Sequence, residues 1–357
     1  MLPMHARSCG CRLNAGGFGR WRLVLLLLAV CGPLVAPRAA VEVTADSAAA
    51  IRREVRVHDP STIVRCKDEY WLFGTGPGLR SWRSKDLVHW QAGPRVFEPL
   101  PAWAKEAVPA NRGGLWAPDV IYHEGRFLLY YSVSTWGRNT SAIGLVTNPT
   151  LDPADPNFQW TDQGWVVRST SKDDFNAIDP GVTRDAEGNL WLVFGSYWSG
   201  IKLVQLDPRT GKPLAGARLH ALAHHSSIEA ACVYRRSNWY YLFVNWGQCC
   251  LGVQSTYNIR VGRSPAITGP YVDRAGRELL AGGGTLVASS AGRFIGPGHA
   301  GIFNDGDREW FSFHFYDQAR GGAPTLAVAP LSWSADGWPV LQHPCAGPAA
   351  QAISPKR

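Results

Sequence analysis

Five similar segments recur between residues 58 and 345, and this repeat limits the possible fold more than any other feature of the chain. Each segment begins with a short unit around one polar or charged residue. A polar turn and an aromatic, apolar stretch follow about ten residues later, a pattern typical of two strands joined by a hairpin turn. The five units are His58-Asp59-Pro60, Ala117-Pro118-Asp119, Ile178-Asp179-Pro180, Ser227-Ile228-Glu229 and Gly298-His299-Ala300.

The aromatic stretches predict the second strand of each repeat, and a third apolar stretch follows most of them. The predicted second strands are Tyr70–Phe73, Phe127–Tyr131, Leu190–Phe194, Trp239–Phe243 and Glu309–Phe313. The predicted third strands are Ala142–Val146, Ile201–Leu206, Asn258–Val261 and Thr325–Val328. No sustained helical period interrupts residues 54–345, although Ala102–Ala107 is expected to form a helical turn.

Repeats of three or four strands cannot bury their faces alone and must stack on one another. Radial stacking produces a propeller with one blade per repeat. We therefore predict an all-β protein, with residues 41–357 forming a five-bladed β-propeller as a single domain. A β-sandwich followed by a second β domain is the alternative, and the uniform order of the repeats disfavours it.

Residues 1–40 are predicted to be a cleaved secretory signal peptide. Arg20 and Arg22 precede the apolar run Leu23–Val30, and small residues follow at Ala36, Ala39 and Ala40. The run is shorter than the roughly 20 residues of a membrane span. We expect a secreted or periplasmic protein without stable membrane insertion. An uncleaved anchor, a wrongly assigned start codon and lipid attachment at Cys31 are the alternatives.

The charge distribution argues against a nucleic-acid partner. The chain has 36 basic and 28 acidic residues, but five of the basic ones are arginines in residues 1–40, so the remainder carries a net charge of only +3. Nucleic-acid binding needs a broad basic patch, and this nearly neutral body does not provide one.

Five cysteines remain after the predicted signal peptide, and an odd number leaves at least one thiol without an intramolecular partner. None has the spacing of a structural zinc site. The adjacent Cys249 and Cys250 would form either a strained vicinal disulfide or two small buried residues, and the sequence leaves both open. Asn139-Thr140-Ser141 is a glycosylation sequon that only a eukaryotic host would use.

The polar residues of the five units are expected to converge, because the first strand of each blade lines the central channel of a propeller. They are Asp59, Asp119, Asp179, Glu229 and His299. Two carboxylates across a small cavity suit glycoside hydrolysis, in which one protonates the leaving oxygen and the other activates water. A third carboxylate would raise the pKa of the acid by repulsion. Aromatic residues that would stack on sugar rings, or pack between blades, lie nearby: Trp116, Trp136, Tyr197, Trp198 and Trp246.

The chain resembles glycoside hydrolase family 43, and within it the secreted arabinanases. The resemblance implies a five-bladed propeller and hydrolysis with inversion of configuration. It rests on motifs that follow one another in order over nearly all of residues 54–305. They include Val57-His58-Asp59-Pro60-Ser61, Gly114-Leu115-Trp116-Ala117-Pro118-Asp119, Asn176-Ala177-Ile178-Asp179-Pro180, Phe194-Gly195-Ser196-Tyr197-Trp198, Ser226-Ser227-Ile228-Glu229, Cys249-Cys250, Ser255-Thr256-Tyr257-Asn258-Ile259 and Gly296-Pro297-Gly298-His299.

The resemblance also implies roles for individual residues. Asp59 matches the general base, Glu229 the general acid, and Asp179 the carboxylate that adjusts the pKa of the acid. Asp119 matches no catalytic position and is interpreted as structural. The substrate-binding residues implied by the motifs are Gly114, Trp116, Asn176, Ser196 and Tyr197.

His299 matches a residue that faces a metal ion in the channel, usually calcium with mostly water ligands. A lone histidine is otherwise more often a satisfied core residue. The implied substrate is plant cell-wall arabinan, a chain of α-1,5-linked arabinofuranosyl units, which a monomeric enzyme would cleave in endo fashion.

One departure and several alternatives remain. The family commonly has Glu-Ala-Pro where this chain has Glu229-Ala230-Ala231, which removes a rigid backbone angle and leaves the pose of Glu229 open. The alternative functions are an exo-acting α-L-arabinofuranosidase or β-xylosidase of the same family, a non-catalytic sugar-binding propeller, and a propeller that binds protein. The Cys249-Cys250 and Ser255-Thr256-Tyr257-Asn258 motifs disfavour the xylosidase and the arabinofuranosidase, and the catalytic carboxylates disfavour both non-catalytic proteins.

Overall fold

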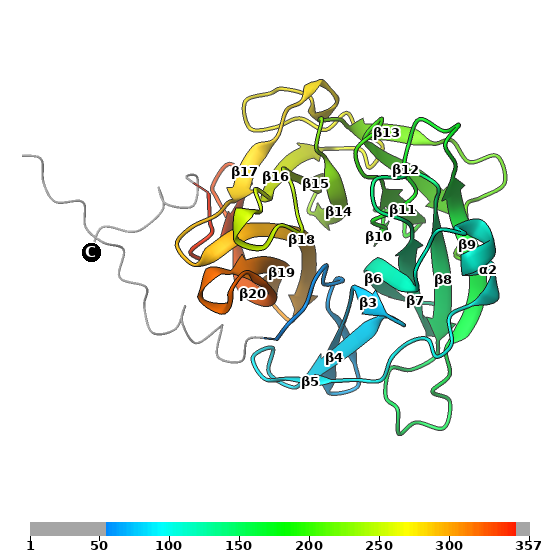
Figure 1. Ribbon diagram of the computed structural model, residues 1–357. Coiled ribbons are helices and arrows are strands. Elements are labelled where there is room, and N and C mark those ends of the chain that lie inside the picture. The colour runs from blue at the N-terminus through cyan, green and yellow to red at the C-terminus, as the bar shows by residue number, and fades with distance from the viewer. Residues whose placement is uncertain (1–54, 348–357) are drawn as a thin grey trace, which may run out of the picture. The chain divides into compact units, whose positions relative to one another are not determined.

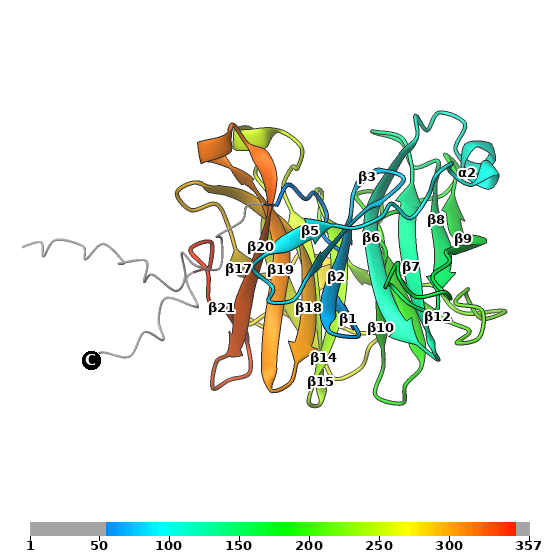
Figure 2. The same ribbon diagram turned by 90° about the horizontal axis from the view of Figure 1, so that it is seen from below.

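The computed structural model describes residues 55–347, and these residues form five antiparallel sheets around a central axis (Figure 1). Seen from the side, the strands run along this axis (Figure 2). We number the sheets as blades 1 to 5 in chain order. The predicted five-bladed β-propeller is confirmed, whereas the predicted signal peptide at residues 1–40 lies outside the described residues.

Each blade is built from strands that follow one another in the sequence, except that β3 lies between two strands of blade 1 and pairs with β6 of blade 2. Blade 1 contains β1 (Val64–Cys66), β2 (Glu69–Gly74), β4 (Arg80–Ser84) and β5 (Trp90–Ala92). Blade 2 contains β3 (Gly76–Pro77), β6 (Gly114–His123), β7 (Arg126–Val133), β8 (Ser141–Asn148) and β9 (Thr161–Ser169). Blade 3 contains β10 (Gly181–Arg184), β11 (Leu190–Phe194), β12 (Ile201–Leu206) and β13 (His220–Ala223). Blade 4 contains β14 (Glu229–Arg236), β15 (Trp239–Trp246), β16 (Asn258–Ser264) and β17 (Thr285–Ala288). Blade 5 contains β18 (Phe294–Asp305), β19 (Arg308–Asp317), β20 (Ala323–Trp333) and β21 (Pro339–Leu341).

The predicted second and third strands all fall within these elements, and the expected helical turn is helix α2 (Ala102–Ala107). Three short 3-10 helices complete the described residues: η1 (Gly252–Gln254), η2 (Leu279–Ala281) and η3 (Gln318–Arg320). No helix in residues 55–347 is long and apolar enough to cross a membrane.

The second strand of each blade is mostly apolar because both of its faces are buried. In β2, Trp71 and Phe73 pack in a cluster shared with blade 2, whereas Tyr70 and Leu72 pack against blade 5. Five such clusters join the five pairs of neighbouring blades. The last pair closes the ring, and there the Tyr70 hydroxyl donates to Asp305 Oδ2 at 2.7 Å.

The innermost segment of every blade contains one non-glycine residue with a left-handed backbone, with φ between 44° and 62°. Such a backbone costs on the order of 1–3 kcal/mol and persists only where its surroundings fix it. Here the N–H group of each of these residues donates to a side chain of the preceding blade, and we call the five contacts the inter-blade ring. They run from Asp59 to His314 Nδ1, Ala117 to Thr75 Oγ1, Asp179 to Ser132 Oγ, Ala230 to Asp179 Oδ2 and His299 to Asn245 Oδ1, at 2.8–3.2 Å.

The inter-blade ring corrects the predicted alignment of the repeats in two blades. Ala117 and Ala230 hold the left-handed position in blades 2 and 4. Asp119 therefore lies two residues after this position, and Glu229 lies one residue before it. The sequence units did not reveal this offset, because Asp119 stands next to a proline as Asp59 and Asp179 do, and Glu229 follows an isoleucine as Asp179 does.

Asp119 is a clamp between blades rather than a residue of the channel mouth. Its Oδ1 accepts the Thr62 N–H of blade 1, and its Oδ2 accepts the Val182 N–H of blade 3, each at 2.8 Å. The side chain is buried, and burial raises the pKa of Asp119 to about 6 although both hydrogen bonds favour the ionised form. These contacts agree with the structural interpretation from the sequence.

The five cysteines of residues 55–347 are free thiols, so Cys249 and Cys250 form no vicinal disulfide in this structure.

The sequon residue Asn139 is buried, and its amide donates to the carbonyls of Asp173 and Phe175 at 2.9 and 3.2 Å. A glycan needs a surface asparagine, so this site is unsuited to glycosylation of the folded protein.

Asp119→Ala is expected to lower the free energy of unfolding by about 2–5 kcal/mol, because it leaves two buried N–H groups without an acceptor. Urea unfolding followed by fluorescence measures this change. Asp119→Asn, which keeps one acceptor oxygen, is the matched control and should lose less. A change in Asp119→Ala of less than about 0.5 kcal/mol, the range of ordinary surface substitutions, would contradict the clamp.

Candidate active site

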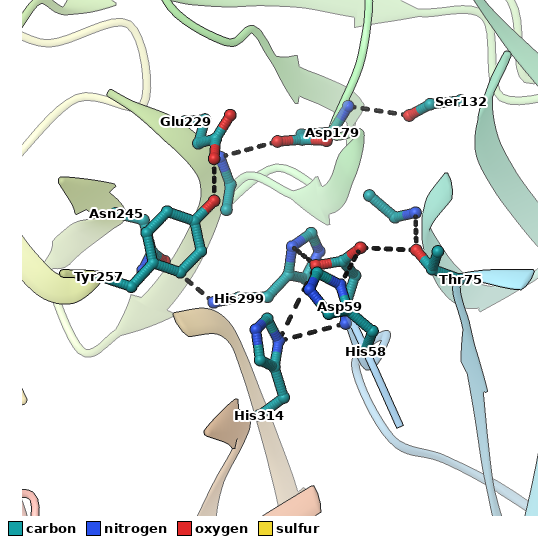
Figure 3. Close-up of polar contacts among 12 residues, drawn as sticks. His58, Asp59, Thr75, Ser132, Asp179, Glu229, Asn245, Tyr257, His299 and His314 are labelled. Atoms are coloured by element: carbon teal, nitrogen blue, oxygen red, sulfur yellow. Dashed lines mark hydrogen bonds and ion pairs between the residues drawn. The ribbon is translucent and has the colours of Figure 1, made fainter. Parts of the chain in front are cut away.

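A cavity of about 790 Å³ lies where the inner segments of blades 1 to 4 meet. Asp59, Asp179 and Glu229, the three predicted catalytic carboxylates, all line it, and each comes from a different blade. Figure 3 shows the contacts that fix them. The structure therefore brings together three acids that are separated by 50 or more residues in the sequence.

Asp59 is surrounded by imidazole rings and one hydroxyl group (Figure 3). Its Oδ2 lies 2.7 Å from His58 Nδ1 and accepts a hydrogen bond from Thr75 Oγ1 at 2.5 Å. Burial would raise the pKa of Asp59, but the charge and hydrogen bond of His58 hold it well below its ordinary value. Asp59 is therefore ionised at neutral pH and far into the acid range.

Glu229 lies in the opposite electrostatic situation. Its Oε2 accepts a hydrogen bond from Ser196 Oγ at 2.7 Å, and its Oε1 accepts one from the Tyr257 hydroxyl. Burial, together with the negative charge of Asp59, raises the pKa of Glu229 to about 7, although the Ser196 hydrogen bond works in the other direction. Glu229 is thus protonated in slightly acidic solution.

Gly298 makes the contact between Tyr257 and Glu229 possible. A Cβ atom at this position in β18 would lie 2.3 Å from Tyr257 Cδ2 and 2.6 Å from Asn245 Nδ2. The glycine therefore lets the tyrosine ring lie against the inner strand, from where its hydroxyl reaches the carboxyl group of Glu229.

Asp179 fixes the backbone that carries Glu229. Its Oδ2 accepts the Ala230 N–H at 3.2 Å, while its own N–H donates to Ser132 Oγ at 2.9 Å. Burial and the charge of Glu229 raise the pKa of Asp179 well above its ordinary value. The pose of Glu229, which the sequence left open, is thus set by side-chain contacts in place of the missing proline.

Four of the five predicted substrate-binding residues line the cavity, namely Trp116, Asn176, Ser196 and Tyr197. Gly114 does not line the cavity, but it lies against Trp116, which does. A Cβ atom at Gly114 would lie 3.0 Å from Trp116 Nε1, so the glycine leaves room for that indole ring.

Two further tryptophans present open ring surface at the cavity. Trp136 and Trp198 line it and are 71% and 42% exposed, so their faces are available to the apolar face of a sugar ring. Trp246 does not line the cavity. It stacks on His225 at a centroid distance of 4.0 Å, and the Arg260 guanidinium lies 4.6 Å from its ring centroid, so the packing interpretation holds for this residue.

Sequence analysis missed several residues that orient the carboxylates. Ser132 and His314 are polar residues with apolar or aromatic neighbours inside mostly apolar strands, and Thr75 directly follows such a strand. Tyr257 lies in a motif to which no role was given. A polar residue in a strand that is buried on both faces needs a hydrogen-bond partner, so the sequence could have marked these residues as part of a polar network.

The predicted metal ligand His299 does not line the cavity and contacts Asp59 instead. Its Nδ1 lies 3.6 Å from Asp59 Oδ1, and the ring is buried. His58, Asp59 and His314 also place ligand atoms within 4.8 Å of one another. Calcium prefers oxygen ligands, so this imidazole-rich cluster suits it poorly, and the Asp59 carboxylate beside His299 is the ligand type that calcium favours.

The channel mouth thus combines one carboxylate whose pKa is lowered with one whose pKa is raised. This pair can activate a water molecule on one side of a bound substrate and protonate a leaving group on the other. The exposed tryptophans give the same cavity a surface for sugar rings.

The comparisons with known proteins agree with this chemistry. A family model described as "Glycosyl hydrolases family 43" matches residues 53–339. The chain is 40% identical over 305 residues to an extracellular exo-α-(1→5)-L-arabinofuranosidase of Cellvibrio japonicus, which covers 82% of this chain and 88% of that protein. It is 41% identical over 291 residues to the extracellular endo-α-(1→5)-L-arabinanase 1 of Bacillus subtilis, which covers 79% of this chain and 87% of that protein.

A solved structure with the same fold is the Cellvibrio cellulosa α-L-arabinanase in complex with arabinohexaose. Its TM-score is 0.79 at 39% identity, and the match covers 81% of this chain and 96% of that one. The family model spans all five blades, and the family resemblance noted in the sequence is confirmed. The chain belongs to glycosyl hydrolase family 43.

Proposed function

We propose that this protein is an endo-acting hydrolase of α-1,5-linked arabinan that inverts the configuration of the anomeric carbon. The observation that carries the proposal is the opposite displacement of two pKa values in one cavity, low for Asp59 and high for Glu229. The names of the relatives support the linkage, and the arabinohexaose bound by one solved relative supports the polymer.

Glu229 would donate its proton to the glycosidic oxygen while the bond breaks. Asp59 would accept a proton from a water molecule that attacks the opposite face of the sugar, which gives inversion. His58 keeps Asp59 ionised until that proton arrives. Asp179 holds the backbone next to Glu229, and its charge would favour the return of the acid to its protonated form.

We also propose that the protein acts outside the cytoplasm, because two relatives are named extracellular and residues 1–40 have the pattern of a signal peptide. The three carboxylates all come from blades of one propeller, so the proposed monomer would need no residue of a second chain for this chemistry.

Exo action is the second candidate, because a relative at 40% identity is named an exo-α-(1→5)-L-arabinofuranosidase. Endo action needs ring-stacking surfaces for several sugar units along an open site. Trp116, Trp136 and Trp198 line the cavity and offer such surfaces, which favours the endo mode.

A digest of linear, debranched arabinan tests the substrate and the mode of action. We expect short oligosaccharides, and we expect Glu229→Gln to reduce kcat by about 10²–10⁴-fold because it cannot donate a proton. Chromatography of the products measures both. Glu124→Gln, which changes an exposed carboxylate, should keep full activity. Arabinose as the sole early product would establish exo action. Undiminished activity in Glu229→Gln would exclude Glu229 as the general acid.

The pH profile tests the assignment of acid and base. Activity should fall as the pH rises through about 7, because Glu229 must be protonated, and it should persist in acid because Asp59 stays ionised there. Ser196→Ala removes a hydrogen bond that favours ionised Glu229, so its alkaline limb should move to higher pH. The profile of kcat/KM for both proteins measures this, and a shift to lower pH would contradict the assignment.

We further propose that His299 contacts a calcium ion that keeps most of its water ligands. Such an ion would add positive charge near Asp59 and favour its ionised form. Calcium added to chelator-treated protein should raise the thermal midpoint, since a ligand of the native state stabilises it, and His299→Ala should abolish the rise. Magnesium is the control cation. An equal rise in His299→Ala would place the ion elsewhere.

A further inference from the structure

The cavity wall contains two adjacent thiols that the proposed hydrolysis does not use. Cys249 and Cys250 follow β15, and both line the cavity. Cys250 is exposed, and its Sγ lies 3.6 Å from His58 Nε2 and 3.9 Å from the Tyr316 hydroxyl. Cys250 and His58 are separated by 192 residues in the sequence.

Cys250, His58 and Asp59 form a series of nucleophile, base and orienting carboxylate. One ring nitrogen of His58 contacts the thiol, and the other lies 2.7 Å from Asp59 Oδ2. The same order activates the thiol of cysteine hydrolases, because the imidazole takes the thiol proton and the carboxylate stabilises the resulting imidazolium. His58 Nε2 also lies 2.8 Å from the Tyr316 hydroxyl, and the thiol is within reach of the same nitrogen. The geometry therefore allows His58 to stabilise a thiolate at Cys250.

The electrostatic surroundings agree with this geometry. Hydrogen bonds of Cys249 and His58 lower the pKa of the Cys250 thiol to about 5, while the contact with Cys250, together with burial, raises that of Cys249. The other titratable groups that sense the charge of Cys250 are Asp59, Asp179, Tyr197, Glu229 and Tyr316.

The remaining cysteines of residues 55–347 lack these properties. Cys66 and Cys345 are buried, and Cys232 is only partly accessible. Burial raises the pKa of Cys232 and Cys345. A reagent that enters the cavity would therefore find one activated thiol among the five.

We propose that Cys250 is a modification site for small disulfides such as oxidised glutathione, and that Cys249 is its resolving thiol. In the first step the Cys250 thiolate attacks the disulfide, a mixed disulfide forms, and one reagent thiolate leaves. In the second step Cys249 loses its proton to solvent and attacks the Cys250 sulfur, and the second reagent thiolate leaves. Two protein thiols are thereby oxidised to one disulfide, and the reagent disulfide is reduced to two thiols.

The resulting vicinal bond would be strained and easily reversed. Adjacent Cα atoms lie about 3.8 Å apart across a trans peptide, whereas disulfides usually span at least about 4.4 Å. Strained disulfides have more oxidising potentials and belong to the labile class.

Both the mixed disulfide and the vicinal disulfide remove the thiolate next to His58 and change the cavity wall beside Asp59. Arabinan hydrolysis should therefore fall and should return with dithiothreitol. That loss of activity rests on the proposed function, but the modification does not.

The test is peptide mapping by mass spectrometry of the native full chain after exposure to oxidised glutathione at pH 6. At this pH a thiol of pKa about 5 is about 300-fold more ionised than one of pKa about 8.5 and about 40-fold less nucleophilic, which leaves about a sevenfold advantage. We expect Cys250 to react at least about sevenfold faster than a cysteine in a short peptide, and Cys66 and Cys345 to react far more slowly.

Two variants separate the steps. Cys249→Ser should stop at the mixed disulfide and retain one glutathionyl group, whereas the wild type should lose it to form the vicinal disulfide. Cys250→Ser should show no rapid modification, and whatever activity it has should resist oxidised glutathione. Reaction of Cys250 no faster than that of the peptide, or equal modification of the Cys250→Ser chain, would overturn the proposal. Mapped modification in a chain that does not cleave arabinan would refute only the proposed hydrolysis.

Discussion

Five buried N–H groups at the mouth of the channel need acceptors, and the inter-blade ring that satisfies them is the constraint on which the site depends. An unpaired buried N–H costs about 1–3 kcal/mol, and a left-handed backbone adds a similar cost. In four blades the acceptor stands at one equivalent place near the end of the second strand. These acceptors are Thr75, Ser132, Asn245 and His314.

Blade 3 breaks this regularity. The equivalent residue there is Gly195, whose N–H donates to the Ile178 carbonyl just as the Thr75 N–H donates to the His58 carbonyl. Gly195 has a φ of 130°, and a Cβ atom would lie 2.5 Å from the Gly200 carbonyl oxygen. With no side chain to accept the Ala230 N–H, the carboxylate of Asp179 takes its place.

This substitution of one acceptor by another brings two acids together. Asp179 is drawn to the backbone that follows Glu229, and the neighbouring Ser196 hydroxyl is free to donate to Glu229. The pairing of Asp179 with Glu229 therefore arises where the inter-blade ring lacks its regular acceptor. The remaining four contacts serve mainly to hold the blades in register.

The repeat and the apolar strands could be predicted from the sequence because burial on both faces of a strand leaves a strong, local pattern. The convergence of Asp59, Asp179 and Glu229 followed from that repeat. The sequence could not show which N–H group each acceptor of the inter-blade ring contacts. Each contact crosses from one blade to the next, and a serine or histidine in a strand carries no sign of its partner. The nearness of Cys250 to His58 was hidden for the same reason, since it depends on contact between blades 4 and 1.

The pKa values of the buried acids differ because their neighbouring groups differ, and not because some are buried more deeply than others. Asp119 meets two N–H groups, and burial still raises its pKa to about 6. Asp59 meets the imidazole of His58, and its pKa falls well below the ordinary value. At Asp119 the neutral donors thus reduce the cost of burial without reversing it, whereas the imidazole beside Asp59 reverses it. Placing a histidine directly before Asp59, and none beside Glu229, is therefore what divides two similar carboxylates into a base and an acid.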